Sequence, residues 1–311
     1  GLVGSEMCIR DSAYPLRSRA SRTDKKDVFS MKVLVTGANG QLGYDVIKRL
    51  NALGDEPVGA DREEFDITDE KATEEYITSL RPDAVVHCAA YTAVDKAEDD
   101  RDACRKVNVD GTRNIALACE KIGAKLVYIS SDYVFGGSGT QPLETDAPKN
   151  PQNIYGITKL GGEKEAEKCK KHFIIRTSWV FGINGGNFVK TMLRLADSHD
   201  SLTVVDDQTG SPTYTPDLAR LICDMIKTEK YGTYHASNEG FCTWAQFAKE
   251  IMRQAGKTAE IVPCTTEQYP AKAKRPKNSR LSKKCLDHAG FDRLPPWQDA
   301  LARFLKELDL V

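Results

Sequence analysis

The chain has 311 residues, 40% of them hydrophobic and 29% charged, so it is long enough to bury a core and is unlike disordered or fibrous proteins. Its 44 basic and 45 acidic side chains give a formal charge of -1, which provides no overall attraction to nucleic acid or to an anionic membrane. The sequence lacks a run of about 18 apolar residues, the length that a membrane-spanning helix needs. We therefore expect a soluble protein with neither nucleic acid nor a membrane as partner.

The nine cysteines are scattered through the chain and form no C-x-x-C pair. An odd, dispersed set is typical of reduced thiols packed as small apolar side chains, rather than of a disulfide framework or a zinc site. This pattern predicts a cytoplasmic protein.

Residues 1–30 mix basic and acidic side chains without a periodic apolar pattern. They lack the apolar stretch of about 7 to 15 residues that a secretory signal requires, and they hold more acids than a transit peptide. We expect an unstructured leader, a cloning scar or an upstream read-through ahead of a start at Met31.

From Met31 onward, short β-branched runs alternate with longer stretches of helical period, which is typical of a parallel sheet covered by helices on both faces. We predict strands at residues 32–36, 57–60, 84–88, 125–130 and 173–176, and helices at 41–53, 69–80, 102–122 and 155–169. The predicted class is therefore α/β, a doubly wound (Rossmann) sheet at residues 31–178.

Beyond residue 178 the elements become shorter and the loops longer. We expect residues 179–311 to form mainly a smaller C-terminal substrate-binding lobe, with some segments returning to the Rossmann domain. Residues 214–217 include Pro216, which is favoured in a first helical turn, so a helix should begin there and run through residues 218–225.

A glycine-rich run follows the first predicted strand, with Gly37, Gly40 and Gly43 at intervals of three. Glycine allows the tight turn and the close approach of a pyrophosphate, and the helix that follows offers free N–H groups to the anion. We assign Gly37, Gly40, Gln41 and Leu42 to a dinucleotide site, with a purely structural turn as the alternative. The spacing resembles that of the short-chain dehydrogenase/reductase superfamily.

An acid about 20 residues after such a turn can bind the adenosine ribose. Asp61 lies 18 residues beyond Gly43, and Arg62 follows it. An acid favours NAD and an arginine favours NADP, so this pair leaves the cofactor open between NADH and NADPH. Asp66 is a candidate for the adenine edge, or alternatively part of a helix N-cap near residues 68 and 69.

The third predicted strand leads directly into small residues, Ala89 and Ala90, followed by Thr92. Ligands bind a doubly wound sheet beyond the carboxyl ends of its strands, and small side chains there let a cofactor pass closely. We assign these three residues to the cofactor site, with ordinary packing as the alternative. His87 is expected to be a core histidine.

Tyr155 and Lys159 form a Y-x-x-x-K motif at the start of a predicted helix, and Ser131 lies 24 residues before Tyr155 at a strand end. Residues spaced i, i+4 share one helix face. A nearby ammonium favours a phenolate, so Lys159 should lower the pKa of Tyr155, and it can also hold the nicotinamide ribose. We predict that Ser131 orients a carbonyl and that Tyr155 supplies the proton during hydride transfer.

With these motifs in place, the sequence resembles the extended short-chain dehydrogenase/reductases, and specifically the dTDP-4-dehydrorhamnose reductase family. The strings that carry the likeness are at residues 35–43, 89–98, 130–135, 155–160, 176–180 and 275–281. The resemblance implies reduction of the 4-keto group of dTDP-4-dehydro-L-rhamnose by NADPH or NADH to give dTDP-L-rhamnose.

The resemblance also implies roles for individual residues. Ser131, Tyr155 and Lys159 match the catalytic trio, with a serine where many relatives have threonine. Tyr133 and Trp179 match residues that line the sugar pocket, with core packing as the alternative for each. Asn187 and Arg275 fall in segments that face the nucleotide, and Arg275 could hold the diphosphate or be merely solvated.

Some relatives dimerise through Mg²⁺ held by glutamates, and the matching positions here carry Asp45 and Asp217. An aspartate reaches less far than a glutamate, so we assign no metal ligand, and both Mg²⁺ and a homodimer stay open.

Two alternatives accompany this interpretation. A nucleotide-sugar 4-epimerase or 4,6-dehydratase would share the fold and the Tyr–Lys pair, although a dehydratase typically has an Asp-Glu pair where this chain has Asp132 and Tyr133. A non-catalytic, NADP-binding regulatory subunit of the methionine adenosyltransferase type is also similar to these reductases.

Overall fold

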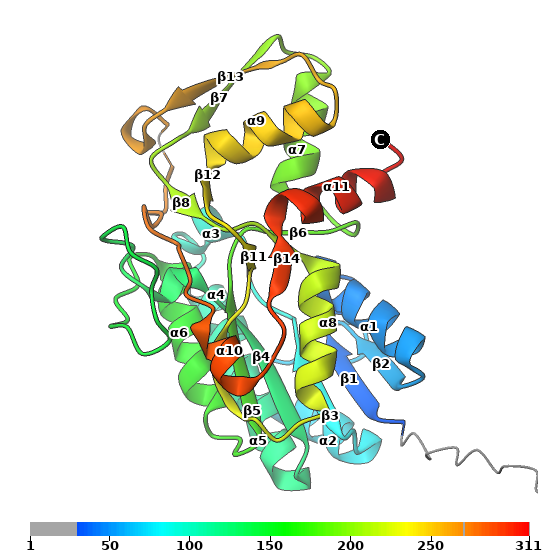
Figure 1. Ribbon diagram of the computed structural model, residues 1–311. Helices are drawn as coiled ribbons and strands as arrows, with labels where there is room; N and C mark the ends of the chain where they lie inside the picture. The colour runs from blue at the N-terminus through cyan, green and yellow to red at the C-terminus, as the bar shows by residue number, and fades with distance from the viewer. Residues whose placement is uncertain (1–29, 270, 311) are drawn as a thin grey trace, which may run out of the picture.

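The computed structural model describes residues 30–269 and 271–310, so the predicted leader lies outside the described residues except for Ser30. A six-stranded sheet forms the centre of the larger lobe, with the strand order β10-β5-β4-β3-β1-β2 (Figure 1). Its strands are β1 (Lys32–Thr36), β2 (Glu56–Ala60), β3 (Ala84–His87), β4 (Lys125–Ser131), β5 (His172–Thr177) and β10 (Gly232–His235). All neighbouring strands are parallel, and the order reverses between β1 and β3. This confirms the predicted doubly wound α/β class.

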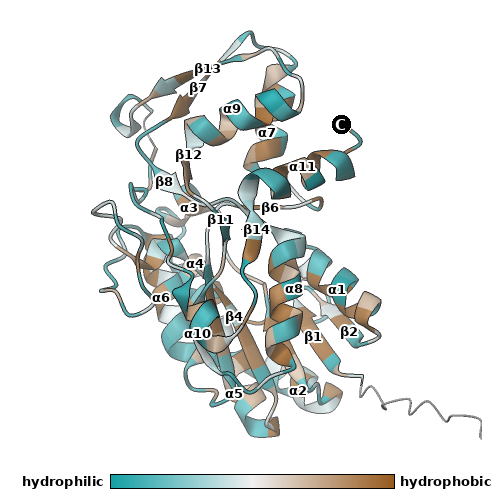
Figure 2. Ribbon diagram, viewed as in Figure 1, coloured by the Kyte–Doolittle hydropathy of each residue, from teal (hydrophilic) through white to brown (hydrophobic). Residues whose placement is uncertain are grey.

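Helices cover both faces of this sheet because successive residues of a strand point to opposite sides. Val33 and Val35 of β1 pack with α1 (Gln41–Leu53) and α8 (Thr215–Ile226), whereas Leu34 belongs to the core on the other face. That second face is covered by α2 (Glu70–Leu80), α5 (Thr112–Ile122) and α6 (Ile154–Ala166). The central strands are correspondingly hydrophobic along their length (Figure 2).

The smaller lobe has a hydrophobic core of its own, built from three helices and a two-stranded pair (Figure 1, top). These elements are α7 (Phe188–Ala196), α9 (Trp244–Gln254), α11 (Trp297–Glu307), β7 (Ser201–Val205) and β13 (Glu260–Cys264). Short pairs connect the lobes: β6 (Val180–Phe181) with β9 (Thr213–Tyr214), β8 (Thr209–Gly210) with β12 (Cys242–Thr243), and β11 (Asn238–Glu239) with β14 (Leu294–Pro296).

Some segments after residue 178 belong to the larger lobe. Strand β10 extends its sheet, α8 packs on α1, and Leu286 of α10 (Lys284–Ala289) joins the same core. Helix α8 begins at Thr215 with Pro216 in its first turn. Three further short helices are α3 (Val94–Ala97), η2 (Asp132–Val134) and η3 (Thr266–Gln268).

The single helix predicted at residues 102–122 is wrong in detail. The structure has α4 (Arg101–Arg105), a π-helical turn η1 (Lys106–Gly111) and then α5. Within that turn, the Asn108 side chain bonds the backbone N–H and carbonyl of Tyr91, a contact that hydrophobic periodicity does not encode. Helix α6 likewise ends at Ala166 rather than at residue 169.

In the two described ranges, no helix combines the length and apolar character needed to cross a membrane. The cysteines described there, Cys88 through Cys285, are all free thiols.

Candidate active site

A cavity of about 1010 Å³ opens at the carboxyl ends of β1, β3 and β4, beside the point where the strand order reverses. Most of its lining comes from the larger lobe, and Trp244 comes from the smaller one. Each residue that we predicted for the cofactor lines this cavity: Gly37, Gly40, Gln41, Leu42, Asp61, Arg62, Asp66, Ala89, Ala90, Thr92 and Lys159. Ligands bind doubly wound sheets at this position.

The glycine turn leaves room for close backbone approach. Gly37 has a φ of 67°, and a Cβ there would lie 2.7 Å from the backbone nitrogen of Ala89. A Cβ on Gly43 would lie 2.1 Å from the carbonyl oxygen of Gly37, so α1 could not pack against the turn. The first turn of α1 has no side-chain cap at Gly40, and its free N–H groups can therefore bind an anion.

At the far end of the cavity, Asp61 accepts a hydrogen bond from the backbone N–H of Asn39, at 2.9 Å. Arg62 is largely exposed and lies 3.5 Å from Asp66. Asp66 accepts hydrogen bonds from the N–H and hydroxyl of Thr68, which hold its pKa below the usual value. Since Asp69 is the residue that caps α2, Asp66 belongs both to the cavity wall and to the loop before that helix.

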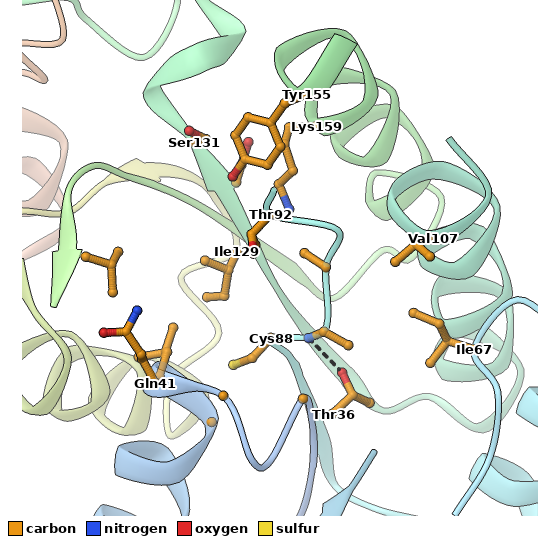
Figure 3. Close-up of a pocket in the computed structure, with 18 of the residues that line it drawn as sticks. Thr36, Gln41, Ile67, Cys88, Thr92, Val107, Ile129, Ser131, Tyr155 and Lys159 are labelled. Atoms are coloured by element: carbon orange, nitrogen blue, oxygen red, sulfur yellow. Dashed lines mark hydrogen bonds between the residues drawn. The ribbon is translucent and has the colours of Figure 1, made fainter. Parts of the chain in front are cut away.

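The segment after β3 crosses the cavity floor. The N–H of Ala89 donates to the hydroxyl of Thr36 at 3.4 Å (Figure 3, dashed line). His87 lies beneath it, with its ring nitrogens hydrogen-bonded to the hydroxyls of Thr36 and Thr112. Burial lowers the pKa of His87 to about 3, so it is a neutral core residue.

Tyr155 and Lys159 project from α6 into the cavity, and Ser131 reaches it from the end of β4 (Figure 3). The phenol of Tyr155 points toward Ser131, and the Lys159 ammonium lies 4.3 Å from the centre of the Tyr128 ring. The structure therefore brings the three residues of the predicted trio together.

The electrostatics of the site differ from our expectation for Tyr155. Burial raises the pKa of Tyr155 above its ordinary value, and the hydrogen bond with Ser131 only partly opposes this. Burial also lowers the pKa of Lys159 to about 8, with Glu163 acting in the opposite direction. The cost of a buried phenolate thus outweighs any influence of the ammonium, and Tyr155 keeps its proton at neutral pH.

Buried contacts fix α6 in place. Asn153 caps the helix by accepting from the N–H of Gly156, and Asn108 donates to the hydroxyl of Thr158 at 3.1 Å. Further along, Glu163 forms a two-point ion pair with Arg176 of β5, both side chains being almost fully buried. These contacts position Tyr155 and Lys159 from both ends of the helix.

The predicted substrate residues divide into two groups. Tyr133 and Trp179 line the cavity, and Tyr133 contacts Tyr155 edge to face at a centroid distance of 5.4 Å. Asn187 lies outside the lining: it caps α7 and donates to the side chain of Gln41 at 3.1 Å. Arg275 also lies outside, where it forms a two-point pair with Asp95. Diphosphate binding by Arg275 would require this pair to open.

Trp244 is a cavity residue that the sequence analysis missed. Its ring stacks on Trp179, with centroids 3.7 Å apart and planes 14° apart. Trp179 has a φ of 50°, an uncommon conformation for a bulky residue. The only sequence signal at Trp244 is an aromatic residue at a helix start in the smaller lobe, which alone indicates core packing.

Neither acid considered for Mg²⁺ lines the cavity. Asp45 is buried and accepts from the hydroxyl of Thr215, while Asp217 pairs with Arg303. Within residues 30–269 and 271–310, no group of three or more His, Cys, Asp or Glu side chains is placed to hold a metal ion.

Comparison with known proteins supports this picture. The family model described as "RmlD substrate binding domain" matches residues 31–310. Over 277 residues the chain is 43% identical to the spore coat polysaccharide biosynthesis protein SpsK of Bacillus subtilis strain 168, covering 89% of this chain and 97% of that protein. It is 40% identical to a dTDP-4-dehydrorhamnose reductase of Streptomyces griseus, covering 86% and 91%.

A solved structure is similar in both fold and sequence. The dTDP-4-dehydrorhamnose reductase of Bacillus anthracis strain Ames, in complex with NADP, matches with a TM-score of 0.87 and 43% identity, covering 89% of this chain and 99% of that chain.

Proposed function

The chain belongs to the RmlD substrate-binding-domain family, and we propose that it reduces the 4-keto group of dTDP-4-dehydro-L-rhamnose with NADPH or NADH to give dTDP-L-rhamnose. The observation that carries this proposal is the meeting of Ser131, Tyr155 and Lys159 in the cavity that begins at the glycine turn. The similarity to reductases of this name supports the substrate, and the NADP complex of a relative supports the cofactor. The free thiols support the predicted cytoplasmic location.

The residues present fit a dinucleotide. Side chains on Gly37 and Gly43 would close the turn, and the free N–H groups of α1 suit a pyrophosphate. Ala89 and Ala90 leave the middle of the cavity open to close approach. When bound, the reduced cofactor supplies a hydride to the keto carbon.

In this mechanism, Tyr155 donates its phenolic proton to the keto oxygen. The phenol is protonated at neutral pH, since burial moves its pKa further above an ordinary value that already lies near 10, and Lys159 stabilises the phenolate that remains. The Ser131 hydroxyl, which donates to Asp132 in this structure, turns its hydrogen to the same oxygen and orients the ketone. Tyr133 and Trp179 offer aromatic surface to the apolar C–H groups of a deoxysugar.

The decisive experiment follows absorbance at 340 nm when the protein is mixed with the dTDP keto-sugar and NADPH, and then with NADH. Consumption of the reduced cofactor in step with formation of the alcohol is expected. An epimerase, which recycles a bound cofactor, would consume none, and a lack of any turnover would contradict the proposal.

Tyr155→Phe removes only the proton donor. We expect kcat to fall by about 10²- to 10⁴-fold, the usual contribution of a general acid, while the Kd for NADPH stays within about twofold. Steady-state rates and fluorescence titration measure the two quantities. Tyr44→Phe, at an exposed tyrosine of α1, is the matched control and should leave both unchanged. If kcat were unaffected in Tyr155→Phe, Tyr155 would not be the donor.

A further inference from the structure

Asp132 is a buried acid beside the reacting groups that has no part in the mechanism above. It is 2% exposed, follows Ser131 directly and lines the cavity. The Ser131 hydroxyl donates to one of its carboxylate oxygens at 2.9 Å, and the Ser279 hydroxyl donates to the other at 2.5 Å. A buried carboxylate is costly for the fold unless it is fully hydrogen-bonded, so its presence at this point requires an explanation.

The bonds around Ser131 show what Asp132 does to its neighbour. The Ser131 oxygen accepts from the N–H of Tyr133 at 3.2 Å and interacts with the phenol of Tyr155. Until a keto oxygen takes it, its single hydrogen is directed at Asp132. Serine has three staggered positions about χ1, and the bonds to Asp132 and from the N–H of Tyr133 favour the one in which the oxygen lies beside Tyr155.

Ser279 is itself held firmly, although it lies far along the chain from Asp132. Its N–H donates to the carbonyl of Thr209 at 2.8 Å, and the preceding Asn278 donates to the carbonyls of Gly137 and Gln141. A segment near the C-terminus therefore reaches the end of β4 and supports the acid next to Ser131.

Whether Asp132 is ionised depends on its hydrogen bonds and on the groups around it. Tyr133 in η2 and Tyr155 on α6 lie close enough to feel its charge, and Arg275, which is paired with Asp95 of α3, acts on Tyr133. Burial raises the pKa of Asp132 to about 6, while the bonds from Ser279 and Ser131 act to lower it.

We propose that Asp132 is a positioning residue, which holds the hydroxyl of Ser131 beside the phenol of Tyr155 and is itself held by Ser279. This inference rests on the function proposed above. The ionised carboxylate is the stronger acceptor, so the hold on Ser131 weakens as pH falls through the region near 6 and Asp132 gains a proton. Turnover of the keto-sugar should decline over the same range.

Two substitutions test this in the full-length protein. Asp132→Asn is nearly isosteric but cannot ionise, so kcat should fall about tenfold at pH 8 and the decline near pH 6 should disappear. Ser279→Ala removes a bond that lowers the pKa of Asp132, so the decline should move to higher pH, by roughly half a unit to one unit. In both variants the Kd for NADPH should stay within about twofold of wild type, because neither residue is among those assigned to the cofactor.

Ser237→Ala is the control, because Ser237 is a buried serine whose hydroxyl has no hydrogen-bond partner in the described part of the chain. Its rates and pH profile should match wild type.

An unchanged pH profile in Asp132→Asn or in Ser279→Ala would overturn the inference, as would a loss confined to NADPH affinity or thermal stability. If Asp132→Asn fails to fold, the shift in Ser279→Ala decides. If the wild type reduces the keto-sugar and the two variants behave like it, only this inference is overturned. If the wild type never reduces the keto-sugar, both proposals are overturned.

Discussion

Burial moves the ionisable groups of the site away from their charged forms. The pKa of Tyr155 rises and the pKa of Lys159 falls, because a charge in a water-poor cavity lacks solvation. These shifts give the two residues complementary states near neutral pH. The tyrosine remains a proton donor, and the lysine is still largely a cation that can stabilise the phenolate left behind.

Because Lys159 must be charged, we expect activity to be lost at alkaline pH. Its pKa of about 8 lies below the ordinary value of 10.5, so its positive charge is present below pH 8 and lost above it. We expect kcat/KM for NADPH to fall toward tenfold per pH unit above 8, because the free enzyme must bind the cofactor with the ammonium intact. Lys159→Met should be slower than wild type at every pH, and its kcat/KM should not show this fall above pH 8.

Initial rates between pH 6.5 and 9.5 measure the effect, with Lys164→Met, at an exposed position of the same helix, as the control. If the fall in kcat/KM above pH 8 persisted unchanged in Lys159→Met, a group other than Lys159 would be responsible for it.

At the scale of elements, α6 depends on its attachment to the sheet. Glu163, one turn beyond Lys159, accepts from Arg176 of β5 at 2.7 and 2.8 Å and from the hydroxyl of Ser130 in β4. Both charged side chains are almost completely buried. Breaking such a pair leaves an uncompensated charge in the interior, which is more costly than never having had the pair.

Glu163→Gln should accordingly lower the free energy of unfolding by about 3 to 5 kcal/mol. Urea denaturation followed by circular dichroism measures this change. Glu75→Gln breaks an exposed pair with Lys71 on α2 and should cost less than about 1 kcal/mol. Equal losses in the two variants would show that the buried pair contributes nothing particular to holding α6.

At the scale of the whole molecule, the cavity depends on the way the two lobes meet. Asn184 donates to the carbonyl of Asn39 at 2.7 Å, and Asn187 donates to Gln41, so the smaller lobe is bonded to the glycine turn itself. The stacked Trp179 and Trp244 close the same cavity. A ligand that fills it therefore contacts both lobes.

This arrangement predicts a fluorescence signal. Of the three tryptophans, Trp179 and Trp244 line the cavity and Trp297 is buried in the core of the smaller lobe. Binding of a dTDP-sugar in the presence of NADP⁺ should change the emission, because stacked indoles respond to a ligand at their surface. Trp244→Phe should remove at least about half of the change, and Trp297→Phe should retain it. The reverse result would place the sugar away from the stacked pair.

Much of the fold and part of the site could be predicted because their signals are local. The glycine turn joins a strand to the next helix, and Tyr155 and Lys159 share a face through i, i+4 spacing. The π-helical turn at Lys106–Gly111 escaped prediction because one extra residue in a turn leaves no mark on hydrophobic periodicity. Trp244 escaped for a different reason, since its partner Trp179 lies 65 positions earlier in the chain.

The amino-acid order by itself determined the doubly wound sheet, its glycine turn and the pairing of phenol with ammonium, since the sheet follows from the alternation of strand and helix patterns along the chain and the other two follow from residues a few positions apart. Only the tertiary structure decided that Arg275 is engaged by Asp95, that Ser279 supports Asp132, and that burial rather than the ammonium governs the pKa of Tyr155. Those outcomes depend on which distant segments pack together and how much water they exclude, and neither quantity is contained in local sequence.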